Sequence, residues 1–463
     1  MSSTASETDV VIQEQGVRER CAARAPNACG LLCLCAGMTL LFVAFQEAQN
    51  AAPQRISEAG LGDFGFYTLA NFYFSLLLGN QVAPYFIQRM SGRVTLPIAA
   101  VGFVLFIASL LTVSHLPRKL IENAPVAIAV MVQLVTLLSG LIGGLLWPSQ
   151  GYVLTHYAPE HLLNWYMSIF SLCFFASGFL GPAVVAPELL TGPDNLVAPV
   201  TLLVLAISGV LFLCALPSDG PAGDASDDSE GLRSRSSRSP RAVGPARLLW
   251  EAPARRLGFV ALAEGWCLNA FVSVVPPILT ASWIARSDSS FHEKFQLVLL
   301  MNGFGHIAAS LLYAPLANRF GRQVMVFFQA LVCLLTAALA NLDLLFGNGS
   351  DALDVGTCAL STGFFLGFGI IMARTNNSAI CAHLYRERAG SAFAFLASAR
   401  GLGSILGLLL LPTMSSHWPK LAVTGSLGWL LVASLCAGLH QPLFGVQSER
   451  AELEGESEST EDV

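Results

Sequence analysis

Long apolar runs, divided six and six by one polar segment, constrain this chain more than any other feature. The hydrocarbon core of a bilayer is about 30 Å thick, and a helix needs roughly 20 apolar residues to cross it. Runs of this kind recur almost to the end of the 463 residues, and no segment between them could hold a second soluble domain. The sequence therefore predicts an all-α membrane protein with twelve transmembrane helices in two six-helix bundles. We expect the spans near residues 30–52, 64–88, 94–114, 124–147, 163–186, 197–216, 257–284, 295–317, 323–346, 353–378, 388–411 and 420–440.

The composition agrees with a chain that lies in lipid. Hydrophobic residues make up 54% of it and charged residues only 12%, whereas a soluble domain has about 25% charged residues. Most of the 11 cysteines lie inside apolar runs. We therefore expect them to pack as small apolar residues rather than to form a disulfide framework.

Polar segments set the expected domain boundaries. The central one has an acidic stretch followed by an Arg/Ser run, a composition that cannot bury a core, so a disordered linker is expected. The first residues lack the features of a cleaved signal peptide, so we expect the first span to remain as an anchor. The expected parts are a disordered cytosolic tail (1–29), an N-terminal bundle (30–216), a disordered cytosolic linker (217–256), a C-terminal bundle (257–440) and an acidic disordered cytosolic tail (441–463).

The distribution of basic residues predicts that both termini face the cytosol, because cytosolic loops carry an excess of Lys and Arg. In this orientation most of the 25 lysines and arginines are cytosolic, although the linker supplies many of them. The sequon at Asn348 then lies in an outer loop, where it is a glycosylation candidate. The outer loops hold only Arg55, Arg118, Lys119, Arg286, Lys294 and Lys420.

Two short turns with glycine and flanking arginines occupy equivalent places in the two halves, after the second and the eighth span. Arginines there meet helix C-terminal carbonyls and anionic lipid heads. Either turn alone is explained as a simple cytosolic anchor, but their equivalent positions favour related halves. The motif residues are Arg89, Gly92 and Arg93 in the first copy, and Asn318, Arg319, Gly321 and Arg322 in the second.

This arrangement resembles the major facilitator superfamily, whose loops at these two places carry a G-x-x-x-D-R-x-G-R-R type motif. The segment 315–322 is the closer match. It departs from the family pattern at Asn318, where an aspartate is usual, and Gln88 stands at the corresponding place in the first copy. That aspartate belongs to a charge relay in many proton-coupled members. The resemblance therefore does not carry proton coupling over to this loop.

A narrower resemblance links the N-terminal half to the UNC-93-like family. Span four reads G-x-x-G-G-x-x-W-x-x-Q-G from Gly140 to Gly151, and span one ends in Gln46, Gln49 and Asn50. Both are similar to segments of that family. Some of its members act as accessory subunits or trafficking chaperones of other membrane proteins, so the resemblance implies a second class of function beside transport.

The resemblance to the superfamily implies that spans one, four, seven and ten line a central cavity. These spans hold a large share of the polar residues. Unpaired polar groups cost several kcal/mol in hydrocarbon, so such side chains should face protein or water. Together with two candidates from spans eight and eleven, the predicted cavity residues are Gln46, Glu47, Gln49, Asn50, Trp147, Gln150, Glu264, Asn269, His306, Arg374, Asn376 and Arg400.

Charged residues at membrane depth are the sharpest of these candidates. Because Glu264 and Arg374 lie at similar depths, we expect them to pair as a gate or substrate contact; a structural ion pair or snorkelling is the alternative. For His306 a proton relay and an interhelical hydrogen bond are both open. Gln150 and Asn376 follow a glycine at the same spacing, so either both face a substrate or both bond neighbouring helices.

Glycines in spans five and eleven predict close helix packing. Gly178 and Gly181 precede a proline in span five, and Gly401, Gly403 and Gly407 follow one another along span eleven. Small residues let helix backbones approach closely within a membrane. We expect packing rather than chemistry at these positions.

The function expected first is transport of a small polar or amphipathic solute by alternating access, in the plasma membrane or an endolysosomal membrane. The sequence has no Walker loop, no H-E-x-x-H and no nucleophile elbow, so an enzyme is not expected, and neither is a metal site, a cofactor or a nucleic-acid partner. The expected partners are the solute and membrane lipids. The alternative is a non-transporting accessory or trafficking regulator of another membrane protein, such as an ion channel or receptor.

Overall fold

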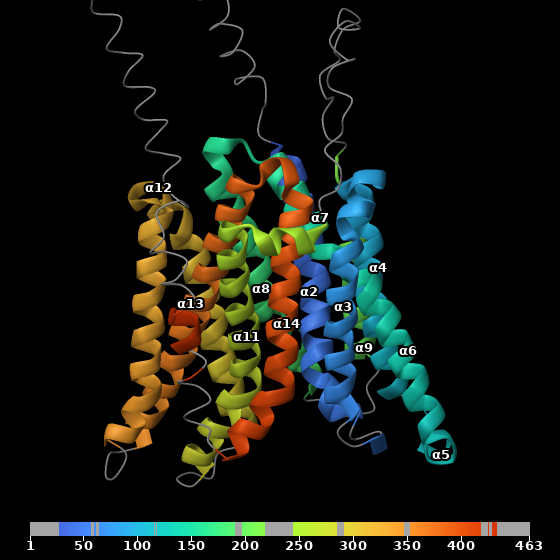
Figure 1. Ribbon diagram of the computed structural model, residues 1–463. Helices are drawn as coiled ribbons and strands as arrows, with labels where there is room; N and C mark the ends of the chain where they lie inside the picture. Colours follow the sequence, from blue (N-terminus) through green and yellow to red (C-terminus); the bar gives the residue numbers. More distant parts are fainter. Residues whose placement is uncertain are drawn as a thin grey trace, which may run out of the picture.

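The computed structural model describes residues 27–56, 60–61, 64–114, 116, 118–189, 197–217, 244–284, 291–346, 352–417, 425 and 428–432. All regular secondary structure in these ranges is helical. The helices of the N-terminal half run side by side with those of the C-terminal half. Helix α8 of the first half and helix α14 of the second lie where the two halves meet (Figure 1).

The N-terminal bundle packs around α2, which lies against α8 and α9, while α6 packs on α3 and α4. The predicted fourth span is two helices, α6 and α7, joined by a turn at Gly144 and Leu145. The helices are α2 (Ala28–Ile56), α3 (Phe64–Met90), α4 (Gly92–Ser114), α5 (Arg118–Asn123), α6 (Pro125–Gly143), α7 (Leu146–Tyr157), α8 (Leu163–Leu189) and α9 (Val197–Cys214).

The C-terminal bundle packs α11 on α14 and α12 on α13. Helix α12 contains the predicted eighth and ninth spans, which meet at Gly321 with φ 80° and ψ 156°. Glycine has no Cβ, so it adopts this positive φ without strain. The elements are the 3₁₀ helix η4 (Pro245–Trp250), α11 (Ala252–Ile284), α12 (Phe291–Phe346), α13 (Ala352–Leu384) and α14 (Ala389–His417).

The predicted spans from 30–52 to 388–411 all fall on helices, with span four divided between α6 and α7 and spans eight and nine joined in α12, while nearly all of 420–440 lies outside the described residues. Several helices are longer than predicted. Helix α7 continues to Tyr157 and α13 to Leu384, whereas the predicted spans end at 147 and 378. The polar side chain of Gln150, which follows the predicted end of span four, is buried between helices with 6% exposure. Its polarity therefore gave a false end for that span.

The linker is also shorter than predicted. We expected disorder up to residue 256, but η4 and the start of α11 occupy its last part. Pro245 and Leu248 are buried, so this segment has apolar anchors that its average composition conceals. The helical part of the C-terminal half thus begins at Pro245 rather than at 257.

Length and hydropathy alone mark five segments of the described residues as candidate membrane spans. Polar side chains in α11, α12 and α13 lower the hydropathy of those helices, and several of these side chains are buried within the protein. None of the eight described cysteines is in a disulfide. Cys35, Cys267, Cys333 and Cys381 are buried, as expected for small apolar packing. The five candidate segments are Ala28–Gln49, Gly92–Val113, Pro125–Tyr157, Leu163–Gly181 and Arg386–Gly407.

Candidate functional site

The two bundles are joined at the end that carries the two arginine turns, which we call the motif end. The Asn164 amide of α8 donates to Oδ1 of Asn318 at 2.6 Å and accepts from Nε of Arg322 at 3.1 Å. The backbone carbonyl of Arg322 accepts from Asn376 at 3.3 Å. One asparagine of the N-terminal bundle therefore bonds two residues of the second loop motif, without a carboxylate.

A second connection at the motif end joins the α7–α8 turn to the C-terminal bundle. The Arg386 guanidinium donates to the carbonyl of Ala158 at 3.0 Å. The Phe393 ring of α14 lies directly over Gly151 of α7, where a Cβ would overlap it. The motif end is thus closed by hydrogen bonds and by a ring packed on a glycine.

Polar contacts between the bundles continue from the motif end toward the middle of the helices. Ser168 donates to the carbonyl of Ser310. Farther in, Thr375 donates to Ser171 at 2.9 Å, and Gln81 of α3 donates to Ser398 of α14 at 2.6 Å. These contacts pair α8 with α12 and α13, and α3 with α14.

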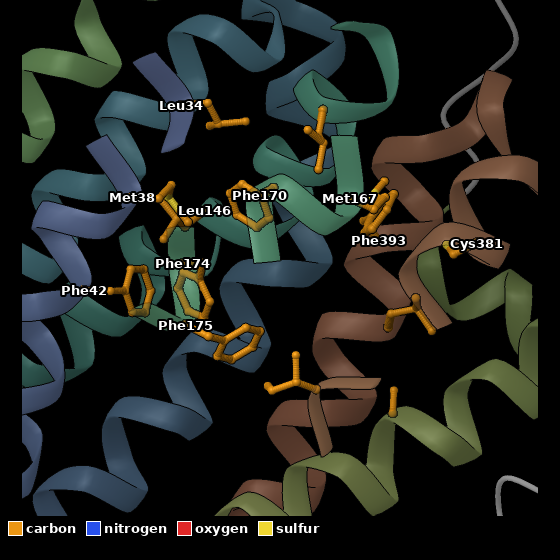
Figure 2. Close-up of a cluster of buried hydrophobic side chains, with 14 of the residues drawn as sticks. Leu34, Met38, Phe42, Leu146, Met167, Phe170, Phe174, Phe175, Cys381 and Phe393 are labelled. Atoms are coloured by element: carbon orange, nitrogen blue, oxygen red, sulfur yellow. The ribbon is translucent and has the colours of Figure 1, made fainter. Parts of the chain in front are cut away.

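A cavity lies between the bundles beyond this closed layer. Its lining comes from α7, α8, α13 and α14. The polar lining consists of Trp147, Gln150, Ser171, Arg374, Ser378 and Arg400. The apolar lining includes Met167, Phe170, Phe174, Phe175, Phe393 and Leu396, and Figure 2 shows the three α8 rings together with Phe393.

We predicted that spans one, four, seven and ten line the cavity, and the structure corrects two of these. In the described part, spans five and eleven contribute in place of one and seven. The polar side chains of α2 and α11 instead contact other helices of their own bundle, as shown below. They were assigned to the cavity from the superfamily resemblance and from their polarity, and neither specifies the direction of a side chain around its helix.

Arg374 is held by aromatic faces rather than by a carboxylate. Its guanidinium carbon lies 4.7 Å from the ring centre of Trp147, 5.2 Å from that of Phe174 and 5.1 Å from that of Phe175. Each such contact is worth about 0.5–2 kcal/mol. No carboxylate of the described residues lies within ion-pair distance of it. Its charge is consequently uncompensated by a counter-charge in the cavity.

The partner of Glu264 is Arg400, not Arg374 as predicted. Nη2 and Nε of Arg400 donate to Oε2 of Glu264 at 2.9 and 3.2 Å, and Asn377 donates to Oε1 at 3.3 Å. The Glu264 side chain is 1% exposed and that of Arg400 15% exposed. Arg400 therefore turns one side to a buried carboxylate and lines the cavity with the other.

Close packing of α11 on α14 explains this choice of partner. A Cβ at Gly265 would overlap the backbone carbonyl of Arg400, and one at Gly403 would overlap that of Leu262. Counting from the helix starts at the motif end, Glu264 is about 18 Å and Arg400 about 17 Å along their helices at 1.5 Å per residue. The glycines bring the helices together where these two side chains are level.

The predicted candidates of span one face α8 and α3. Oε1 of Gln46 accepts from Ser177 at 3.4 Å, and Gln49 accepts from Tyr73 at 3.0 Å. The Glu47 carboxyl group lies against Gly181, 2.6 Å from where a Cβ would stand. The glycines of span five therefore make room for polar side chains of α2. The side chains of Asn50 and Asn269 lie outside the described part.

Asn376 takes the interhelical role among the alternatives, whereas Nε2 of His306 has no hydrogen-bond partner in the described part. Asn376, 2% exposed, accepts from the hydroxyl of Tyr313 at 3.1 Å. Gln150 does line the cavity, so the two residues do not share a role. His306 is buried with its ring 5.2 Å from that of Phe175. It lies on the Phe175 side of the bundle contact and is not a lining residue of the cavity.

The two copies of the loop motif differ in what they contact. In the first, Arg89 donates to the hydroxyl of Tyr85 one turn back at 2.8 Å. Gly92 begins α4 where a Cβ would lie 2.6 Å from Tyr152. In the second copy Arg319 stacks on Phe320, while Asn318 and Arg322 reach the other bundle. Arg93 begins α4 beside Gly92, and Asn348 lies outside the described residues.

Several site residues were not predicted. Asn164, Ser171 and the α8 rings come from span five, which has no charged residue and is not among the spans that the resemblance placed at the cavity. An available signal was the aromatic group in span five, in which Phe174 lies one turn after Phe170 and Phe175 follows directly.

A sequence model of the Major Facilitator Superfamily matches residues 28–408. The chain belongs to the major facilitator superfamily. The match extends across both bundles and the turns between them. It identifies an integral, multi-pass membrane protein and points to a transporter rather than an enzyme. A search of curated proteins by sequence finds no match to this chain.

Solved structures of transporters share the fold. The human organic anion transporter MFSD10 (TETRAN) is 17% identical, with a TM-score of 0.60 over 89% of this chain and 100% of that one. The proton:xylose symporter XylE, solved with 6-bromo-6-deoxy-D-glucose, is 14% identical, with a TM-score of 0.67 over 90% and 96%. A bacterial homologue of the iron transporter ferroportin, in an outward-facing state, is 15% identical, with a TM-score of 0.60 over 89% and 98%.

Proposed function

We propose that this major facilitator protein is a secondary transporter that moves a small polar or amphipathic solute by alternating access. The observation that carries the proposal is the cavity between the bundles, which holds two arginines and is closed at the motif end by contacts between opposite bundles. Sites at repeat interfaces near the membrane middle are typical of such carriers. The similar solved structures are those of an organic anion transporter, a proton:xylose symporter and a homologue of an iron transporter, so they do not select one class of solute.

The closing contacts suit a movable gate. They are hydrogen bonds between neutral groups, worth about 1 kcal/mol net each, and hydrogen bonds from Arg322 and Arg386, worth about 1.5–3 kcal/mol each. Rocking the bundles apart at the motif end exchanges them for bonds to water, so their loss is inexpensive. A permanent interface would instead use a large apolar surface.

Cross-linking across the interface tests alternating access. Cysteines at Gln81 and Ser398, whose side chains bond at 2.6 Å between α3 and α14, are bridged with a reducible dithiol-specific linker in proteoliposomes. The vesicles are loaded with a panel of organic acids, amino acids and sugars, and efflux is measured by mass spectrometry. We expect efflux of at least one solute to stop on cross-linking and to return on reduction, because the bundles must separate at this end.

A bridge within one bundle is the matched control. Asn71 and Gln133, both in the N-terminal bundle, also bond at 2.6 Å, so cysteines there accept the same linker without joining the bundles. That variant should keep its efflux, and linker-treated wild type reports any effect of the native cysteines. Undiminished efflux from the Gln81/Ser398 bridge contradicts alternating access. No efflux of any solute, with one membrane protein co-purifying, favours the accessory role.

We further propose that the chain is of the UNC-93-like type and that both termini are cytosolic. The span-four glycines that carry the resemblance pack on α3: a Cβ at Gly140 would overlap Ser75, and one at Gly144 the carbonyl of Leu76. In this orientation Asn348 is extracellular or luminal, whereas the sequon at Asn376 is buried. Expression in eukaryotic cells should give a glycosidase-sensitive mass shift that Asn348→Gln abolishes. A shift that persists in this variant contradicts the orientation.

A further inference from the structure

We propose that the cavity binds an organic anion, a carboxylate or sulfonate on a flat apolar body, with Arg374 holding the anionic group. This deepens the proposed function by naming the class of solute, and it rests on that function for the claim that the bound molecule is transported. The argument depends on the charge balance of the cavity, on the state of its carboxylate and on the shape of its walls.

The charge balance of the cavity is positive. Its only charged lining residues in the described part are Arg374 and Arg400. Arg400 is neutralised by Glu264 at 2.9 Å, whereas Arg374 has no such partner. A guanidinium at membrane depth is costly without a counter-charge, and aromatic faces offset only part of that cost. An anionic solute supplies the missing charge.

The state of Glu264 argues against a zwitterionic solute. A zwitterion also needs an anionic or strongly accepting group for its ammonium. The Glu264 side chain is 1% exposed, and its two oxygens accept from Arg400 and Asn377. The carboxylate is therefore occupied and shielded. A free amino group would meet two arginines and no carboxylate of the described cavity lining.

The walls of the cavity are largely apolar and aromatic, so the part of a solute that they contact is expected to be apolar. Rings from α8 and the Phe393 ring from α14 form the two sides (Figure 2). Trp147 and Phe174 lie edge to face at 5.1 Å, with Arg374 against both. Gln150 and Ser378 add polar groups on the same lining. The guanidinium fork has the planar geometry that pairs with a carboxylate.

The anionic group at Arg374 could come from a soluble organic anion or from the headgroup of an anionic lipid. We assign the site to the soluble anion. The cavity lining combines aromatic rings with a single free cation and bonded polar groups. A phospholipid headgroup has no apolar part at its anionic end to lie against such rings.

Binding to the purified full-length protein in neutral detergent tests the proposal. Thermal unfolding is followed with a thiol-reactive dye, which reports the buried cysteines as they become exposed. The probes are 2-naphthoate, its neutral isostere 2-naphthamide, the cation 2-naphthylmethylamine and phosphatidylglycerol. We expect saturable stabilisation by 2-naphthoate alone, and an Arg374→Gln variant should weaken this binding on the order of tenfold or more, the usual value of a charge-assisted pair.

Matched variants keep the result interpretable. Arg319→Gln removes an arginine outside the cavity and should bind 2-naphthoate as the wild type does. Arg374→Lys retains the charge and loses the planar guanidinium group. Its affinity for 2-naphthoate should therefore lie between those of the wild type and Arg374→Gln, and it can be measured even if the glutamine variant folds poorly. Equal stabilisation by 2-naphthamide, unchanged binding in Arg374→Gln, no saturable shift with 2-naphthoate, or stabilisation only by phosphatidylglycerol each overturns the proposal.

The outcome is separable from that of the proposed function. Anion binding through Arg374 in a protein that gives no efflux supports the anion site and contradicts transport. Efflux of a neutral solute that is unaffected by Arg374→Gln supports transport and contradicts the anion site. Efflux of an anion that falls on Arg374→Gln supports both.

Discussion

Replacing Glu264 with glutamine should lower the free energy of unfolding by about 3 kcal/mol, as removal of one partner from a buried ion pair does. Glutamine keeps the volume but leaves the Arg400 guanidinium, 15% exposed, without its counter-charge. Arg400→Gln should cost a similar amount because it strands a carboxylate that is 1% exposed. The double variant should recover much of the loss. Unfolding in mixed detergent micelles gives the four free energies of this cycle.

A second ion pair in the same bundle is the control for this cycle. Arg388 and Glu251 also lie 2.9 Å apart, but their side chains are 39% and 35% exposed. Water screens such a pair, so its cycle should give about 1 kcal/mol or less. Additive losses at Glu264 and Arg400, or equal coupling in the two pairs, contradict the view that burial makes the cavity pair strong.

The fold could be predicted from the sequence because membrane-crossing helices need long apolar runs. Such runs are recognised from local composition alone, without knowledge of which helices are neighbours. Helix ends were predicted less well. Hydropathy averages over a window, so the predicted fourth span ended before Gln150, although this residue lies buried inside the continuous helix α7. The lost information is which neighbour a polar side chain meets, and that depends on the packing of helices distant in sequence.

In the candidate site too, some features could be predicted from local sequence and others depend on how the helices pack. Trp147, Gln150, Arg374 and Arg400 were predicted for the cavity and line it. Depth along a helix was predictable, but direction around it was not, so Glu264 was paired with an arginine of similar depth on the wrong helix. The correct partner follows from the contact of α11 with α14, a contact that two glycines permit.

The second largest effect is expected at one of these glycines. Gly403→Ala should destabilise the protein by about 1–3 kcal/mol, the range for overpacking a close contact. Its Cβ would overlap the backbone carbonyl of Leu262, which belongs to α11 and cannot turn aside as a side chain can. The helices must separate, and the ion pair two residues along α11 must lengthen. The free energy of unfolding in mixed micelles measures the loss.

Gly401, on the same helix, is the matched control. The nearest atom to a Cβ there is Cβ of Leu77 at 3.9 Å, an ordinary contact. Alanine favours a helix over glycine by about 1 kcal/mol, so Gly401→Ala should be neutral or stabilising. If the strain at Gly403 acts through the ion pair, combining Gly403→Ala with Glu264→Gln should cost less than the sum of the two single losses. A full sum, or equal effects at Gly401 and Gly403, contradicts the role of this glycine in setting Glu264 against Arg400.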